Sequence, residues 1–190
     1  MIAGLLLAAG GARRFGSQKL LAHLHGRPIV RLAATNLAAE TDVLWVVVGS
    51  ESEAVRGALN GLAARFVENE RWEDGLSSSL AAGIRALPPE VDAIVIGLGD
   101  QPFVDREVIR RVIDRWRETG RSIVSARYNG VRGHPVLLTR AVFGEASSVS
   151  GDVGARELIA RDPARVAFVD VNADAPGDVD TTDDLSALEQ

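Results

Sequence analysis

Short apolar runs alternate with amphipathic segments along most of the chain. Apolar runs of about four to eight residues are typical of buried strands, whereas apolar residues spaced three and four apart are typical of helices. Strands are predicted at residues 2–8, 43–48, 65–68, 91–98, 122–126, 136–138 and 166–171. Helices are predicted at residues 28–39, 51–59, 77–87, 105–118, 153–160 and 182–188, with Ser50 and Asp105 capping the second and the fourth.

This alternation predicts an α/β fold, a three-layer αβα sandwich in which helices cover both faces of a mostly parallel sheet. Residues 91–98 are the most apolar of the later segments, so we expect them to form a central parallel strand. Residues 136–138 are expected to form a short strand, for which an antiparallel orientation stays open. Because the chain shows neither an internal repeat nor a credible linker, residues 1–190 are predicted to form a single domain.

Composition and charge exclude several classes of function. The sequence has no cysteine, which excludes disulfides, thiolate metal sites and a cysteine nucleophile. Acidic residues outnumber basic ones by 26 to 21, whereas nucleic-acid binders usually carry a basic excess, so we expect no nucleic-acid partner. No apolar run approaches the roughly 20 residues that span a bilayer, and no basic residue precedes the apolar start as in a signal peptide. We therefore expect a cytoplasmic protein with no membrane partner.

A glycine-rich segment, residues 7–19, follows the first predicted strand. Small residues at the carboxyl end of such a strand let backbone N–H groups approach phosphate oxygens. Arg14 can bind a phosphate through two parallel hydrogen bonds, and Lys19 supplies a point charge. The segment fits neither the Walker pattern nor the dinucleotide Gly-x-Gly-x-x-Gly pattern. Its alternative interpretation is an ordinary strand–helix connection with solvated basic residues.

Two aspartates are candidate magnesium ligands. Asp100 follows the central predicted strand, where its carboxylate faces a cleft, and Mg²⁺ typically binds one or two carboxylates plus substrate phosphates. The alternative for Asp100 is a turn residue. Asp180 lies in an acidic segment that also starts the last predicted helix, and for it both interpretations stay open.

A candidate substrate-binding loop contains His134. Residues 129–135 are punctuated by glycines, and loops of this kind often carry binding groups. His23 and His25, by contrast, flank a predicted turn at Gly26, where ordinary surface roles are expected.

Taken together, these segments resemble the nucleotidyltransferases of molybdenum cofactor biosynthesis, most closely the molybdenum cofactor cytidylyltransferases. The family opening runs Leu-Ala-Ala-Gly-x-Ser-x-Arg-Met-Gly-x-x-Lys, and Ala12 and Phe15 depart from it here. The absence of the Ser hydroxyl removes one potential hydrogen bond to phosphate but neither charged residue. The opening matches at Leu7, Ala8, Ala9, Gly10, Arg14, Gly16 and Lys19, and later matches lie within residues 69–80, 99–102, 133–138, 151–156 and 178–181. The opening marks a broad superfamily, whereas residues 133–135 and 151–156 are narrower signals.

The resemblance implies a Rossmann-like, GT-A-like nucleotidyltransferase fold. It also implies transfer of CMP from CTP to the phosphate of molybdopterin, with Mg²⁺ as cofactor. The implied catalytic residues are Arg14, Lys19 and Asp100, and the implied metal ligands are Asp100 and Asp180. The implied nucleotide-binding residues are Leu7, Ala8, Ala9, Gly10, Gly11, Arg14, Lys19, Ser77 and Ser78. The implied pterin-binding residues are Gly133, His134, Pro135, Asp152 and Arg156.

Several alternatives stay open at this stage. Cytidylyl members tend to carry Ala-Ala-Gly and guanylyl members Ala-Gly-Gly, so the opening favours CTP over GTP. The enzyme alternatives are a guanylyltransferase on the same pterin and a cytidylyl- or uridylyltransferase on another phosphorylated metabolite. A purely carrying role is disfavoured by the joint presence of Arg14, Lys19 and Asp100, although delivery to a molybdoenzyme client after transfer stays open. Trp72 is expected only to pack.

Overall fold

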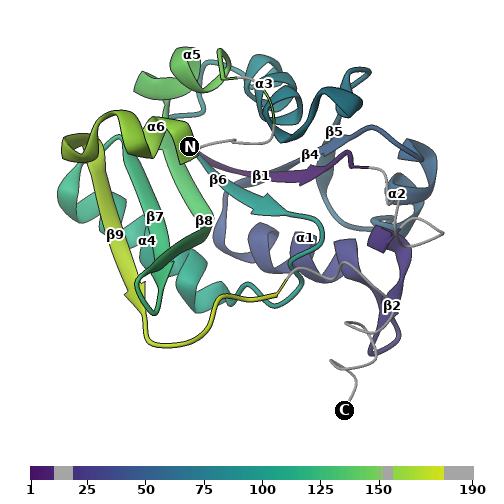
Figure 1. Ribbon diagram of the computed structural model, residues 1–190. Coiled ribbons are helices and arrows are strands. Elements are labelled where there is room, and N and C mark those ends of the chain that lie inside the picture. Colours follow the sequence, from purple (N-terminus) through teal and green to yellow (C-terminus); the bar gives the residue numbers. More distant parts are fainter. Residues whose placement is uncertain (11–18, 150, 152–155, 178–190) are drawn as a thin grey trace.

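The central feature of the molecule is a mostly parallel sheet (Figure 1). The computed structural model describes residues 1–10, 19–149, 151 and 156–177, and among these residues the sheet has seven strands in the order β5-β4-β1-β6-β8-β7-β9. They are β1 (Ile2–Ala8), β4 (Val43–Val48), β5 (Ala64–Glu68), β6 (Ala93–Leu98), β7 (Ile123–Tyr128), β8 (Val131–Thr139) and β9 (Val166–Val171). Neighbouring strands are parallel except at β8, which is antiparallel to both β6 and β7. The predicted α/β class and mostly parallel sheet are therefore confirmed.

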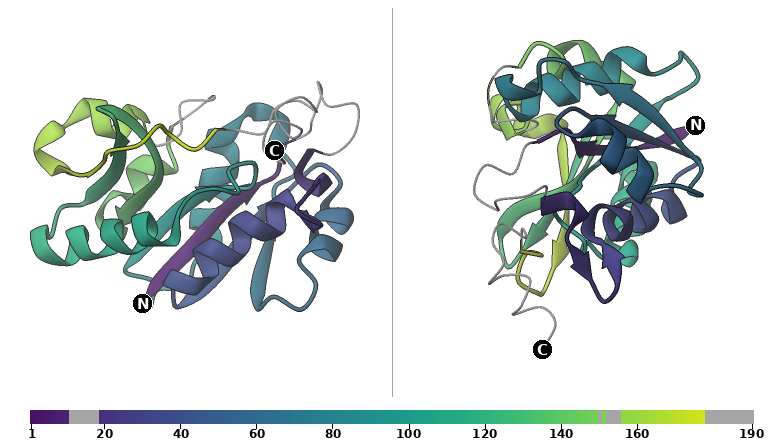
Figure 2. Two further views of the ribbon diagram at one scale, coloured as in Figure 1. Left: turned by 90° about the horizontal axis from the view of Figure 1, so that it is seen from below. Right: turned by 90° about the vertical axis from the view of Figure 1, so that its right-hand side faces the viewer.

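Helices cover both faces of this sheet, which gives three layers (Figure 1, Figure 2). On one face lie α1 (Ile29–Glu40), α2 (Ser52–Ala58) and α4 (Arg106–Thr119). On the other lie α3 (Leu76–Ala86), α5 (Phe143–Ala146) and α6 (Arg156–Arg161). The shorter elements are η1 (Lys19–Leu21), β2 (His23–Leu24), β3 (Arg27–Pro28), η2 (Trp72–Asp74), η3 (Arg140–Val142) and η5 (Pro163–Arg165).

Two apolar cores, one on each face, explain why the central strands read as unbroken apolar runs. Successive residues of a strand point to opposite faces: Leu6 of β1 packs in the core under α1 and α4, whereas Leu5 and Leu7 pack under α3. Helix α3 packs closely against β1: a Cβ added at Gly83 would lie only 2.6 Å from Cδ1 of Leu5. Both faces of β1 must therefore be apolar, as in other buried parallel strands.

The element boundaries agree with the sequence-based expectation to within a few residues, with two corrections. Ser50 is not the cap of α2: the capping position belongs to Glu51, in the left-handed region at φ 52°, and the backbone N of Ser50 instead donates to the carbonyl oxygen of Ala9. The short strand expected at residues 136–138 is β8, which runs from Val131 to Thr139 and is antiparallel. Asp105 does cap α4, accepting a hydrogen bond of 2.7 Å from the backbone N of Glu107.

Two predicted helices lie partly or wholly outside the described residues. The helix expected at residues 153–160 is described from Arg156, where α6 begins. The helix expected at residues 182–188 lies wholly outside. None of the described helices combines the length and apolarity needed to cross a bilayer.

Candidate active site

Four parallel strands bring small and polar residues to one edge of the sheet. The residues that follow β1, β4, β5 and β6 are Ala9, Gly49, Asn69 and Gly99. Backbone hydrogen bonds tie these ends together, from Asn69 N to Val48 O at 2.8 Å and from Gly99 N to Leu7 O at 3.0 Å. Ligands bind beyond this carboxyl edge in open α/β sheets.

The segment after β1 presents backbone to this edge. Leu7, Ala8 and Ala9 are buried and belong to the two cores. Gly10 is exposed, and a Cβ added there would meet nothing within 4 Å. Small residues and bare backbone are what a phosphate or a sugar needs for close approach.

Lys19 and Asp100 form an ion pair at this edge. The Nζ of Lys19 lies 2.7 Å from Oδ2 of Asp100, and their side chains are only 20% and 22% exposed. Lys19 begins η1 and Asp100 follows β6, so the pair joins residues that are far apart in the sequence. A half-buried pair of opposite charges can bind both the oxygens of a phosphate and a cation that accompanies it.

The start of α3 is held by a compact polar network. The side-chain nitrogen of Asn69, a residue only 4% exposed, donates to the hydroxyls of Ser78 (2.9 Å) and Ser79 (3.0 Å). The hydroxyl of Ser78 also lies 2.8 Å from the carbonyl oxygens of Arg71 and Gly75, to which it can donate. Ser78 thus stabilises the turn before α3, and its nucleotide-binding role stays a prediction, as does that of the buried Ser77.

A cleft of about 150 Å³ opens beside this network. It brings the predicted nucleotide-binding serines of α3 next to Gly151, the first residue of a segment predicted to face the acceptor. Its lining residues are Asn69, Arg71, Asp74, Ser77, Ser78, Ala81, Arg85, Ser147, Val149 and Gly151. Trp72 packs over Gly49, where an added Cβ would lie 2.7 Å from Cβ of Trp72; that it serves only to pack stays a prediction.

The loop predicted to bind the acceptor is a bulge at the start of β8. Ser125 of β7 pairs with Val136, but the next residue, Ala126, pairs with Gly133, so His134 and Pro135 are extra residues between two regular pairs. The peptide bond between them is cis. Since β8 is antiparallel to β6, its first residues reach the same edge of the sheet as Asp100.

Tyr128 supports this bulge from β7. Its hydroxyl donates a hydrogen bond of 2.9 Å to the carbonyl oxygen of His134, and its ring lies 3.1 Å from the position of a Cβ at Gly133. Burial, with a smaller contribution from Asp105, raises the pKa of Tyr128 to about 12. The phenol therefore stays protonated, and remains a donor, throughout the physiological range.

Most of this chain matches one known protein family. The family model described as the MobA-like NTP transferase domain matches residues 4–166. That span contains most of β1, the Lys19–Asp100 pair and the His134 bulge. The chain belongs to the MobA-like NTP transferase family.

Relatives that match this MobA-like chain along nearly its whole length carry different names. Nicotine blue oxidoreductase of Paenarthrobacter nicotinovorans is 34% identical over 198 residues, covering 98% of this chain and 96% of that protein. The crystal structure of Rv0371c from Mycobacterium tuberculosis is 32% identical, with a TM-score of 0.87, and covers 99% of this chain and 97% of that one. A complex of Rv0371c with manganese is 33% identical, with a TM-score of 0.80, and covers 98% and 96%. Membership therefore fixes the fold and the enzyme family, but not the substrates.

A divalent cation fits the chemistry of Asp100 in this MobA-like chain. Its carboxylate is a hard oxygen ligand, and it accommodates a cationic group, the ammonium of Lys19, at 2.7 Å. One protein carboxylate with substrate phosphates and water is a common ligand set for Mg²⁺. Among the described residues, no three His, Cys, Asp or Glu side chains gather as a metal site, so Asp100 is the metal-binding candidate within this part of the chain.

Several predicted site residues lie outside the described part of the MobA-like domain. Gly11, Arg14, Asp152 and Asp180 are among them, and Arg156 is placed only as the first residue of α6. Asn36, Asn69 and Tyr128 are not among the site residues predicted from the sequence. Tyr128 carried a usable signal, since it is the only tyrosine of the chain and precedes the Asn-Gly turn of a hairpin.

Proposed function

We propose that this chain is a Mg²⁺-dependent nucleotidyltransferase that transfers CMP from CTP to the terminal phosphate of molybdopterin. The observation that carries the proposal is the Lys19–Asp100 pair at the carboxyl edge of the sheet, in a chain of the MobA-like NTP transferase family. Such a pair, next to a buried strand end that offers backbone rather than side chains, suits a triphosphate and its counterion. The choice of CTP and of a pterin rests on the residues that resemble the cytidylyltransferases.

In the proposed reaction, a phosphate oxygen of the acceptor forms a bond to the α-phosphorus of CTP. The bond between the α-phosphorus and the bridging oxygen breaks, and pyrophosphate leaves with that electron pair. An ionised phosphate nucleophile needs no strong general base, so catalysis rests on alignment and charge neutralisation. Lys19 and Arg14 would hold the triphosphate, and Asp100 with Asp180 would hold Mg²⁺, which neutralises charge on the phosphate oxygens.

The remaining residues are assigned to the two substrates. The backbone of Leu7, Ala8, Ala9, Gly10 and Gly11, with Ser77 and Ser78, would line the nucleotide pocket. Gly133, His134, Pro135, Asp152 and Arg156 would face the acceptor. The alternatives weighed from the sequence stay as fallbacks: GTP on the same pterin, another phosphorylated acceptor, and delivery to a molybdoenzyme client.

A second candidate function is an oxidoreductase. It is favoured by one observation, the 34% identity with nicotine blue oxidoreductase along 98% of this chain. Since the sequence has no cysteine, such a reaction would require a bound electron carrier, and a nucleotide cofactor would fit the same edge of the sheet. Oxidation of NADH or NADPH by this protein in the presence of a quinonoid dye would support this candidate.

The deciding experiment is pyrophosphate release with each of the four NTPs and Mg²⁺, with and without molybdopterin. Release that requires both CTP and the pterin supports the proposal. Release that prefers GTP keeps the chemistry and overturns the nucleotide assignment. An absence of release with every NTP and acceptor, combined with turnover of a nicotinamide nucleotide, would replace the proposal by the oxidoreductase. An Asp100→Asn variant and a chelator control show whether release depends on the site and on a divalent metal.

A further inference from the structure

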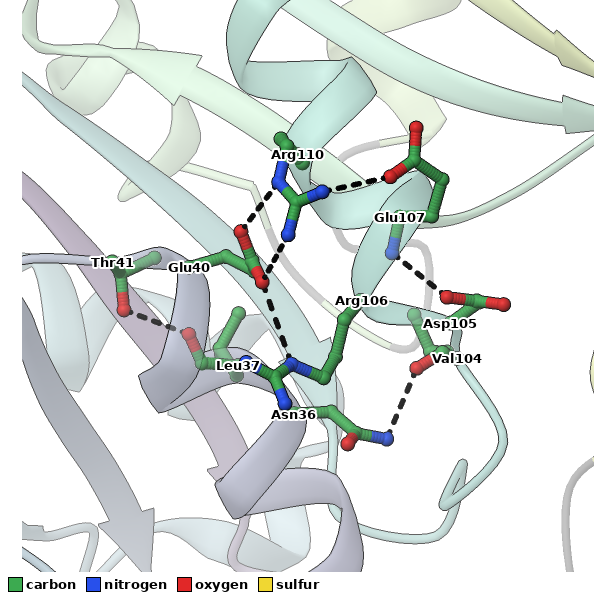
Figure 3. Close-up of polar contacts among 9 residues, drawn as sticks. All are labelled: Asn36, Leu37, Glu40, Thr41, Val104, Asp105, Arg106, Glu107 and Arg110. Carbon is green, nitrogen blue, oxygen red and sulfur yellow. Dashed lines mark hydrogen bonds and ion pairs between the residues drawn. The ribbon is translucent and has the colours of Figure 1, made fainter.

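The loop that carries Asp100 is held by a side chain from another element. Residues 99–105 connect β6 to α4, and the side-chain nitrogen of Asn36 in α1 donates to two of their carbonyl oxygens, Pro102 O and Val104 O, both at 3.2 Å. Figure 3 shows Asn36 pointing from α1 toward Val104, in the loop that precedes α4. A primary amide has two N–H donors, so this one side chain uses both of them on the loop.

At its start the loop is tied to the sheet, because Gly99 N donates to Leu7 O of β1 at 3.0 Å. Gln101 N donates to Leu98 O at 3.2 Å, and Val104 N donates to Gln101 O at the long distance of 3.5 Å. Pro102 and Val104, whose carbonyls Asn36 binds, are buried, and Val104 belongs to the core beneath α1 and α4, whereas Phe103 between them is 41% exposed. Asn36 therefore adds a polar tie from α1 to the part of the loop that follows Asp100, beside the hydrogen bond at Gly99 and the packing of Val104.

Helix α1 also positions the partner of Asp100. The backbone N of Ile29, the first residue of α1, donates to Ala22 O at 2.9 Å, and Ala22 N donates to Lys19 O at 3.1 Å. Leu20 is buried in the core beneath α1, and its Cδ2 lies 3.3 Å from the position of a Cβ at Gly99. The segments that carry Lys19 and Asp100 are thus both hydrogen-bonded to residues of α1.

A separate contact fixes α1 against α4. Glu40, one turn after Asn36, has a side chain only 9% exposed and accepts two hydrogen bonds of 3.0 Å from Arg110, with Arg106 at 3.4 Å (Figure 3). Residues four apart lie on one face of a helix, so α1 uses one face for two tasks. Glu40 binds α4, whereas the two hydrogen bonds of the Asn36 side chain go to the loop.

We propose that Asn36 is a positioning residue that sets the place of Asp100 relative to Lys19 and so tunes the metal and triphosphate site. The inference rests on the proposed function for its consequence in catalysis, but its structural part does not. Removing the amide releases two carbonyls and lets the Asp100 loop shift without touching either charged group. Misplacement of reacting groups by about 1 Å can cost up to about a hundredfold in rate.

The test compares Asn36→Ala with three other variants. Alanine is the best helix former, so the substitution removes the amide while leaving α1 intact. Thr35→Ala is the matched control, because the exposed Thr35 hydroxyl bonds only to Arg31 O within α1. Arg110→Ala loosens the helix–helix contact without changing the loop contact, and Asn36→Gln keeps an amide on a stem one methylene longer.

Three quantities are measured on the full chain: amide hydrogen exchange of residues 99–104, Mn²⁺ affinity in the presence of CTP, and kcat with its dependence on metal concentration. For Asn36→Ala we expect faster exchange confined to the loop, a Mn²⁺ dissociation constant and a metal activation midpoint raised about tenfold, and kcat lowered about tenfold. Asn36→Gln should recover part of each loss, and Thr35→Ala should change none. Arg110→Ala should lower the unfolding midpoint without a local change in exchange.

The inference is overturned if loop exchange and Mn²⁺ affinity in Asn36→Ala match the wild type, or if Thr35→Ala reproduces its losses. A wild-type protein that transfers no nucleotide would defeat the proposed function by itself. Loop exchange and Mn²⁺ affinity would still decide whether Asn36 positions Asp100, so the two failures are distinguishable.

Discussion

The Nζ of Lys19 lies 2.7 Å from Oδ2 of Asp100, although the two residues are 81 positions apart in the sequence. Lys19 begins η1, whereas Asp100 follows the end of β6. Their closeness follows from the parallel arrangement of β1 and β6, whose carboxyl ends open at one edge. Because each charge is half-buried beside the other, loss of either one disturbs the electrostatics of the whole edge.

Removal of either charge should abolish most of the proposed activity. Lys19→Ala and Asp100→Ala are each expected to lower kcat by at least about a hundredfold, since loss of one group that stabilises a transition-state charge costs on the order of 3 kcal/mol. The double variant should lose far less than the product of the two, because the residues act as a unit. Arg117→Ala, which breaks an exposed pair with Asp114, is the control and should retain normal turnover. Near-normal kcat in either site variant would contradict the assignment.

The ionisation of Tyr128 can be followed directly, because it is the only tyrosine of the chain. Tyrosinate absorbance should titrate with a midpoint of about 12 in the folded protein and near 10 after denaturation in urea. The folded pKa is above the unfolded one, so its stabilising effect is complete below pH 10 and declines as the pH rises toward 12. The free energy of unfolding should therefore fall over that interval, and fall less in Tyr128→Phe. A folded-state midpoint near 10 would show that the phenol is not buried as described.

Tyr128→Phe should also affect the acceptor side of the reaction selectively. The variant loses the hydrogen bond to the carbonyl oxygen of His134, which is worth about 1 kcal/mol. We expect the KM for the acceptor to rise about threefold to tenfold, while the KM for CTP is unchanged. Steady-state kinetics with each substrate varied in turn would check this, and an equal rise in both constants would contradict a role confined to the His134 bulge.

Two helical glycines should respond to alanine in opposite directions. A Cβ at Gly83 would lie 2.6 Å from Leu5 Cδ1 and 3.0 Å from Val47 Cγ2. Overpacking of this kind costs about 1–3 kcal/mol, more than the gain in helix propensity of about 1 kcal/mol, so Gly83→Ala should destabilise. A Cβ at the exposed Gly57 of α2 would meet nothing within 4 Å, so Gly57→Ala should stabilise by about 0.5 kcal/mol. Urea unfolding of the two variants measures both effects, and stabilisation by Gly83→Ala would show that α3 can move away from the sheet.

The apolar pattern was sufficient to predict the architecture, because strands buried on both faces have few other interpretations. β1 and β4 are found at the predicted residues, and the Asp105 cap of α4 is found where Asp precedes an amphipathic run. The predicted cap of α2 was wrong. The backbone N of Ser50 donates to the carbonyl oxygen of Ala9 at the end of β1, and a local sequence pattern contains no sign of such a non-local bond.

For the site, residue type and position at strand ends indicated Lys19 and Asp100, which the fold brings together. Asn36 could not have been found in the same way. It lies in the middle of an amphipathic helix, where Asn usually faces solvent, and its contacts with Pro102 and Val104 depend on how α1 packs against the sheet. Tyr128 acts through a β-bulge, and the pairing of β7 with β8 decides which side chain lies under it.

The reversed strand β8 also has a consequence for diversification within the family. It is joined to β7 by a tight turn at Asn129 and Gly130, both with positive φ, so the two strands form a local hairpin. The register of β5, β4, β1 and β6 is set elsewhere, by parallel pairing that the hairpin tip does not enter. We therefore expect substitutions and insertions at that tip to leave the geometry of β5, β4, β1 and β6, and of the adjoining Lys19–Asp100 pair, unchanged. With the hairpin as the proposed acceptor site, changes at its tip alone would let the same sheet take a different second substrate.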